Sequence, residues 1–364
     1  MSRIIPTSLL IVICSLFFSP AWSQTTISNY KPGVTTDGAV YFLPKTALRI
    51  SVLIERTTYE PGDFVNYAQR YLRLPNVSAE RSVSYRVTGI TQTPVGMADQ
   101  KKGFAVKFNA KTVAANVALA DDGRLLAINA EPSTEILPEP FVAAPTAKRL
   151  NSKQFLNEEI LSAGSTAKMA ELTAREIYDL RENRSLLIKG QADFMPQDGA
   201  QLKLMLAQLE TQEKSLLSMF EGVTERDTTE LVLTYVPEAP VVRQVLFRLS
   251  QQVGLVDADD LSGEPFYITI ENLQALPAPD AEAAAKAKKK EYESGVYVNV
   301  PGRIRSTIYK GIDQIEQDEC QCAQFGNVEL LSADLFNKHY TTQLWINPVT
   351  GAVERLLSSS QDRK

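Results

Sequence analysis

The chain has 364 residues, 44% of them hydrophobic, and a net charge of −5. This mild acidity argues against nucleic acid as a partner, because phosphate binding requires clustered Lys and Arg. At about 100 to 200 residues per domain, the length favours two domains over one, and the hydrophobic content is sufficient for a packed core.

The first 23 residues are typical of a cleaved signal peptide. Arg3 supplies a positive charge, residues 9–18 form an apolar run, and Ala21 and Ser23 are small residues at the positions that a signal peptidase reads. We expect cleavage between Ser23 and Gln24. Cleavage removes the positive charge of Arg3, so the net charge moves from −5 to −6.

The same segment is a poor membrane anchor. Pro6 and Pro20 bracket an apolar run shorter than the ~18 residues that a membrane-spanning helix needs, and no later stretch qualifies. The sequence therefore predicts an exported protein with no transmembrane segment after signal removal, located in the periplasm or associated with the cell envelope.

After a polar leader at 24–37, which we expect to be flexible, the pattern at 38–129 predicts an α+β domain. Alternating apolar residues at 48–54 indicate a strand, and apolar residues at helical spacing in 64–72 indicate a short helix. Further strands are expected at 82–91, 104–109 and 117–129. The last is interrupted at Asp121, Asp122 and Gly123, which favour a hairpin turn.

Four prolines between 130 and 165 predict a linker or crossing segment, and a second domain is expected at 166–360. Thr173 with Glu176 resembles a capping box, and Gly190 follows the last turn of the helix. A second helix is expected from about 196 to 221, ended by Gly222, so the two form a helical hairpin. Strands are then predicted at 231–236, 241–249, 266–270, 296–300, 344–346 and 352–356, the last pair joined by a turn at 347–351.

The predicted fold class is therefore α+β. It comprises an N-terminal mixed sheet with one short helix, followed by a helical hairpin attached to a mostly antiparallel β domain. The Ala-rich and Lys-rich stretch at 280–291 is strongly helix-forming; its basic cluster could touch anionic lipid or glycan, but we interpret it as a solvated spacer.

A search for catalytic motifs identifies no catalytic or cofactor-binding residue. His339 is the only histidine, which excludes zinc sites built on two or three histidines. A Ser-His-Asp triad could use only this residue, and the Gly-x-Ser-x-Gly elbow that would carry its serine is absent. Gly-x-Gly-x-x-Gly and phosphate-loop motifs are absent too, so no nucleotide cofactor is expected.

Two clusters of side chains are candidates for binding or redox chemistry. Asp257, Asp259, Asp260 and Glu264 are weak candidates for a calcium site, although the spacing does not match an EF-hand loop, and a turn with a helix cap is the alternative. Cys320 and Cys322 are a possible disulfide, which would close a small, strained ring, or they are incidental thiols in a surface loop.

Several segments resemble an uncharacterised family of secreted proteins from Gram-negative envelopes, classed as a domain of unknown function. They occur in order along most of the chain: 41–46 (YFLPKT), 58–62 (TYEPG), 67–72 (YAQRYL), 174–178 (AREIY), 195–199 (MPQDG), 254–265 (GLVDADDLSGEP) and 323–326 (AQFG). The resemblance implies an envelope location and one shared architecture. It implies no activity and no functional residue, and Cys320 and Cys322 are not part of the pattern.

Three hypotheses about function follow. The first is a non-catalytic binding or structural protein of the envelope whose partner is a protein or a glycan. The second is a hydrolase that cleaves envelope glycan with two carboxylates; its sign would be a cleft with two close acids and aromatic side chains such as Trp345 or Tyr267. The third is a role in assembly, for which exposed apolar patches would be the sign.

Overall fold

The computed structural model describes residues 26–29, 39–107, 116–135, 138–145, 151–196, 198–273, 295–332 and 340–360. The predicted signal peptide, the spacer at 280–291 and His339 lie outside these residues. The fold is α+β, as predicted, and the strands form three sheets. All pairs of strands within the described residues are antiparallel.

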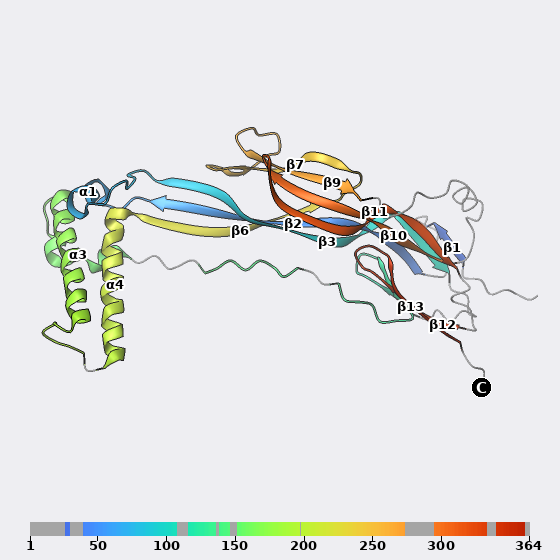
Figure 1. Cartoon of the computed structure of the whole chain (residues 1–364), viewed down its shortest axis with the longest axis horizontal. Helices are drawn as coiled ribbons and strands as arrows, with labels where there is room; N and C mark the ends of the chain where they lie inside the picture. Colours follow the sequence, from blue (N-terminus) through green and yellow to red (C-terminus); the bar gives the residue numbers. More distant parts are fainter. Residues whose placement is uncertain are drawn as a thin grey trace, which may run out of the picture.

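The first sheet has the order β1-β3-β2-β6 and runs along the length of the molecule (Figure 1). Its strands are β1 (Thr26–Asn29), β2 (Ala39–Glu60), β3 (Ser82–Lys107) and β6 (Val223–Tyr235). The strand β1 lies inside the predicted flexible leader and pairs with β3, so regular structure begins earlier than the sequence indicated.

The second sheet packs against the first and has the order β11-β10-β9-β7-β8. Its strands are β7 (Val241–Ser250), β8 (Gly254–Val256), β9 (Glu264–Asn272), β10 (Gly295–Lys310) and β11 (Asp313–Ser332). Alternating apolar residues of β2, among them Ile50 and Val52, share one core with Phe266, Ile268 and Ile304 of this sheet. The alternation predicted at 48–54 is therefore the buried face of β2.

The third sheet has the order β13-β12-β5-β4. It comprises β4 (Val117–Leu119), β5 (Leu125–Ile128), β12 (Tyr340–Ile346) and β13 (Val353–Ser360). The predicted turns at both hairpins are present: Gly123 and Gly351 have positive φ angles of 85° and 75°. Leu125 and Ile128 pack with Leu344 and with Tyr41 and Leu43 of β2 in a second core.

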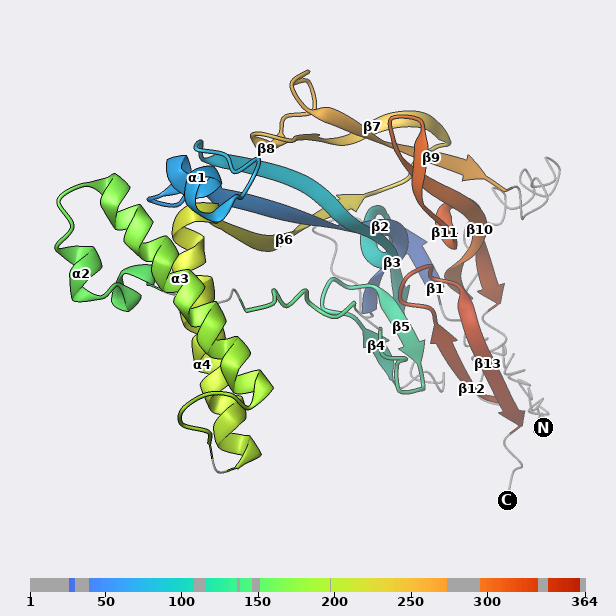
Figure 2. The same cartoon turned by 60° about the vertical axis from the view of Figure 1, so that its left-hand side comes forward.

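The helices gather at one end of the molecule around a third core (Figures 1 and 2). After the 3₁₀ turn Val65–Tyr67 come α1 (Ala68–Leu72), the 3₁₀ turn Ser152–Phe155 and α2 (Glu158–Leu161), followed by the long pair α3 (Thr166–Lys189) and α4 (Gly199–Glu221). The hairpin of α3 and α4 projects from the end of the first sheet, with its connecting loop far from the strands. None of the helices in the described part of the chain combines the length and apolar composition that a membrane crossing needs.

The start of α3 differs from the prediction. The residue that caps it is Ser165, whose side chain accepts a hydrogen bond from the Lys168 amide, and Thr173 lies buried two turns inside the helix. The Thr173 hydroxyl donates to the Met169 carbonyl instead. The apparent capping box was wrong because the same two residue types also suit a helix interior when the hydroxyl bonds one turn back. The ends at Gly190 and Gly222 are confirmed.

Two sheets combine strands from both predicted domains. Residues 48–60 of β2 pair with β6, and β5 pairs with β12. The boundary expected at 130–165 therefore does not separate the hydrogen-bonded sheets. Part of that segment crosses the third sheet, where the Trp345 indole N–H donates to the Glu131 carbonyl over 3.0 Å.

Candidate functional site

The acidic loop at 257–264 is a compact turn between β8 and β9. The Asp260 carboxylate accepts a hydrogen bond from the Ser262 amide over 2.8 Å, which lowers the pKa of Asp260. The Arg248 guanidinium donates to the carbonyls of Ala258 and Gly263, and Glu264 pairs with Lys310 over 3.1 Å. The Arg248 guanidinium thus binds two backbone oxygens of this turn, and its positive charge there disfavours a bound calcium ion.

The remaining metal candidates do not form a cluster. Asp257 and Asp259 are exposed on the same turn. Within the described residues, no group of three or more His, Cys, Asp or Glu side chains is arranged to hold a metal ion.

The two cysteines are free thiols on β11 rather than in a loop. Cys322 is buried between the first two sheets and its thiol donates to the Gln324 side-chain oxygen over 3.3 Å, while Cys320 is half-buried beside it. Burial disfavours the thiolate and raises the pKa of Cys320 to about 12. At neutral pH both groups are packing residues rather than nucleophiles.

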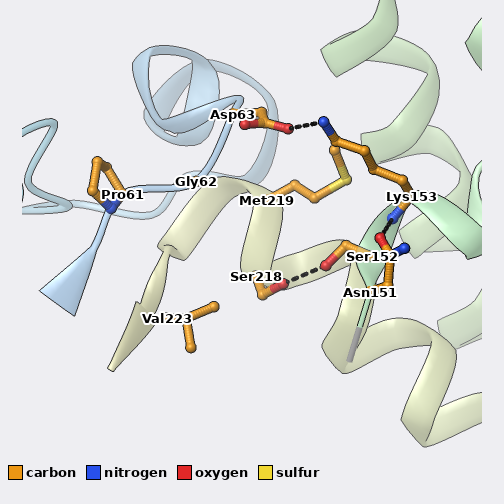
Figure 3. Close-up of a pocket in the computed structure, with 9 residues that line it drawn as sticks. All are labelled: Pro61, Gly62, Asp63, Asn151, Ser152, Lys153, Ser218, Met219 and Val223. Carbon is orange, nitrogen blue, oxygen red and sulfur yellow. Dashed lines mark hydrogen bonds and ion pairs between the residues drawn. The ribbon is translucent and has the colours of Figure 1, made fainter. Parts of the chain in front are cut away.

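A polar cavity of about 360 Å³ lies where the loop after β2 meets the C-terminal end of α4. Figure 3 shows its lining, to which three separate segments contribute: Pro61, Gly62, Asp63, Asn151, Ser152, Lys153, Ser218, Met219 and Val223. The loop approaches α4 closely because residue 62 is glycine; a Cβ there would overlap the Met219 carbonyl. The Phe64 amide donates to this same carbonyl over 2.7 Å.

The polar groups of this cavity are mostly paired with one another. The Lys153 ammonium lies 3.8 Å from the Asp63 carboxylate, and the hydroxyls of Ser152 and Ser218 are 2.9 Å apart. Among the described residues that line the cavity, Asp63 is the only carboxylate, so the cavity does not bring together the two acids that glycoside hydrolysis uses.

A second hollow lies on the first sheet and is lined by Arg56, Thr58, Glu60, Arg81, Glu225, Arg226 and Asp227. It contains acids but no aromatic side chain. Trp345 and Tyr267 lie elsewhere, where each ring is covered by an arginine, Arg355 and Arg243 respectively. The structure therefore does not place these aromatic residues beside paired carboxylates in any of the hollows described.

A more apolar hollow lies at the end of the helical hairpin. We call it the tip groove; its volume is about 490 Å³ and it is lined by Asn183, Leu186, Leu187, Ala192, Asp193, Phe194, Met205, Gln208, Leu209 and Gln212. Phe194, in the loop between α3 and α4, is 89% exposed. Ile188, Met195, Leu204 and Met205 nearby are also exposed. An apolar surface of this kind is the usual sign of an interaction site.

Comparison with known proteins places the chain in a family. Residues 37–354 match the family model described as a domain of unknown function, DUF4831. The chain belongs to this family. No curated protein and no solved structure matches it.

The DUF4831 match confirms that the chain belongs to an uncharacterised domain family, and it assigns no residue to an activity. The tip groove was not foreseen from the sequence. Phe194 and Met195 lie in a short loop without periodicity, so only the fold shows that they stay exposed. The signal that could have indicated the groove is the pair of adjacent apolar residues immediately before Pro196, at the end of a predicted helical hairpin.

Proposed function

We propose that this DUF4831 protein is an exported, non-catalytic binding protein of the cell envelope that holds an amphipathic helix of a partner protein in its tip groove. The observation that carries the proposal is the groove itself, whose lining includes Phe194, a side chain that is 89% exposed. Exposing an aromatic ring to water costs free energy that partner binding recovers.

The shape of the groove favours a helix as the ligand. Its α4 side is formed by Met205, Gln208, Leu209 and Gln212, which recur at the three- and four-residue spacing of one helical face. These residues span about two turns, or roughly 10 Å. A third helix laid between two antiparallel helices is a common way to complete such a face.

The charge of the groove lining indicates which side chains the partner helix carries. Among the described residues that line it, Asp193 alone is charged, and Asn183, Gln208 and Gln212 supply neutral amides. We therefore expect a partner helix with apolar side chains on one face and a Lys or Arg beside them, facing Asp193.

The envelope location rests on the first 23 residues and on the resemblance described above. Residues 9–18 form the apolar run and Ser23 precedes the expected cleavage site. N-terminal sequencing of the protein purified from cells should begin at Gln24, and cell fractionation should recover it with the envelope. An intact N-terminus at Met1 on protein from the cytosol would contradict export.

The partner can be sought by site-specific cross-linking in intact cells. A photoreactive amino acid at position 208 lies in the groove. The same group at position 312 is a matched control, because Ile312 is 88% exposed in the turn between β10 and β11 and does not line the groove. A protein that cross-links from 208 but not from 312 is identified by mass spectrometry. A synthetic peptide covering its cross-linked segment is then titrated into the purified full chain.

We expect Phe194→Asp to weaken binding of that peptide at least tenfold and Ile312→Asp to change it less than twofold. Both side chains are exposed, so neither change should affect folding. Cross-links that are the same from both positions, or equal affinities for the two variants, would contradict the tip groove as the binding site. Turnover of labelled peptidoglycan by the purified protein would instead favour the hydrolase.

A further inference from the structure

The third sheet ends in a strand whose outer edge is open. β13 pairs with β12 on one side, and within the described residues neither a strand nor a backbone hydrogen bond from another segment reaches its other side. Its residues from Glu354 to Ser359 are exposed. Because an edge strand presents a row of backbone N–H and C=O groups, the partner that fits it is another extended strand.

Most of the other sheet edges carry features that oppose pairing. β6 has Glu225, Arg226, Asp227 and Glu230 along its length, β11 is acidic and irregular in register, and β4 and β8 have three residues each. In β13, by contrast, no charge follows Arg355, and Leu356 and Leu357 lie exposed at the middle of the strand. Charges, bulges and short lengths are the usual protections of an edge, and the second half of β13 has none of them.

The sequence of β13 is compatible with pairing to itself. When two copies of a strand pair antiparallel about a two-fold axis perpendicular to the sheet, one residue on the axis faces its own copy. If the axis passed through Glu354 or Arg355, that residue would face its own copy and two like charges would lie opposite each other. An axis at Leu356 places leucine against leucine, Arg355 against Leu357 and Glu354 against a serine, so no like charges are opposed.

We propose that the outer edge of β13 is a self-association surface, through which two copies join their third sheets into one continuous antiparallel sheet with Leu356 or Leu357 at the two-fold axis. The helical hairpin lies at the opposite end of the molecule from β13 (Figure 1). Association at β13 therefore leaves the tip groove of each copy accessible, and the two proposals can fail independently.

Sedimentation of the purified full chain between about 5 and 200 µM tests the association directly. We expect a concentration-dependent dimer that Leu356→Lys abolishes. With the axis at Leu356 the lysine faces its own copy, and with the axis at Leu357 the two lysines lie diagonally across the strand pair. The matched control is Val242→Lys: Val242 is 82% exposed on β7 of the second sheet, where a bulge interrupts the pairing with β9. The Val242→Lys variant should form the dimer to the same extent as the unsubstituted chain.

Cysteine substitutions on β13 report the register of the pair. Directly opposed residues in an antiparallel pair have Cα atoms about 4.5 to 5.5 Å apart, within disulfide range. We expect either Leu356→Cys or Leu357→Cys to form a covalent dimer readily under mild oxidation, while Val242→Cys does not. A chain that remains monomeric throughout, or three cysteine variants that cross-link equally, would overturn the proposal.

Discussion

Arg124 links the two hairpins of the third sheet to each other and to the crossing segment. It is 8% exposed, and its guanidinium donates to Asp122, to Glu135 over 3.1 Å and to the Pro348 carbonyl. One side chain thereby joins the β4–β5 turn, the crossing segment and the β12–β13 turn.

Replacing Arg124 with methionine should therefore lower the free energy of unfolding by about 2 kcal/mol, because two carboxylates and a carbonyl lose their donor. Urea denaturation measures the change. Arg303→Met removes an exposed partner of Glu319, which Arg305 still holds, and should leave the midpoint nearly unchanged. Equal midpoints for the two variants would show that Arg124 does not have this role.

The cysteines give a second prediction at the residue scale. Burial raises the pKa of Cys320 to about 12, so the thiolate that reacts with Ellman's reagent is scarce in the folded protein. At pH 8 we expect labelling at least a hundredfold slower than after unfolding. Unfolding without reductant should release the reactive thiols of Cys320 and Cys322. Failure to release them would indicate that Cys320 and Cys322 form the predicted disulfide.

At the scale of the elements, the paired strands β10 and β11 approach each other closely at two glycines. A Cβ at Gly326 would overlap the Val300 carbonyl oxygen, and one at Gly302 would overlap the Phe325 carbonyl. We expect Gly326→Ala to destabilise the protein by about 2 kcal/mol or more, because the strands must separate. Gly199→Ala is the control: it lies at the exposed start of α4 with no atom near the new Cβ, and should stabilise by up to about 1 kcal/mol. Thermal unfolding of both variants checks the contrast.

Elements specified by local patterns could be predicted from the sequence. Gly190 and Gly222 end their helices as expected, because a helix end depends on a few adjacent residues. The alternation at Ile50 and Val52 identified the strand for the same reason. Most of β11 could not be predicted, since its first half is polar and is held by pairing with β10 rather than by burial of one face.

Long-range pairing was the other element that the sequence did not reveal. Residue 50 of β2 pairs with residue 233 of β6, a connection that no local pattern encodes. The predicted domain boundary relied on composition alone and so could not anticipate it. The tip groove also depends on contacts between segments that are separated in the sequence. Phe194 lies on its surface because of the way that α3 and α4 pack.

At the scale of the whole molecule, three cores lie in series along β2 and the loop that follows it. Tyr41 belongs to the core of the third sheet, Ile50 to the core between the first two sheets, and Phe64 to the helical core. The outer half of the helical hairpin extends beyond the last of these: the buried residues of α4 begin at Glu213.

Hydrogen exchange should therefore be graded along the molecule. We expect backbone amides at 200–210 to exchange at least tenfold faster than those at 213–220, and those of central β2 to be the slowest, because protection follows buried contacts. Exchange followed by mass spectrometry resolves the three segments. Uniform protection across them would contradict independent opening of the hairpin tip.

The length of β2 also determines how the molecule responds to tension. Its 22 residues span about 70 Å at ~3.3 Å per residue, with β3 bonded along one side and β6 along more than half of the other. A pull between the helical end and the third sheet acts along the strand axis, so many inter-strand hydrogen bonds bear the force together and none can open first. The first sheet should therefore be stiff along its length, so that a displacement at one end is transmitted to the other.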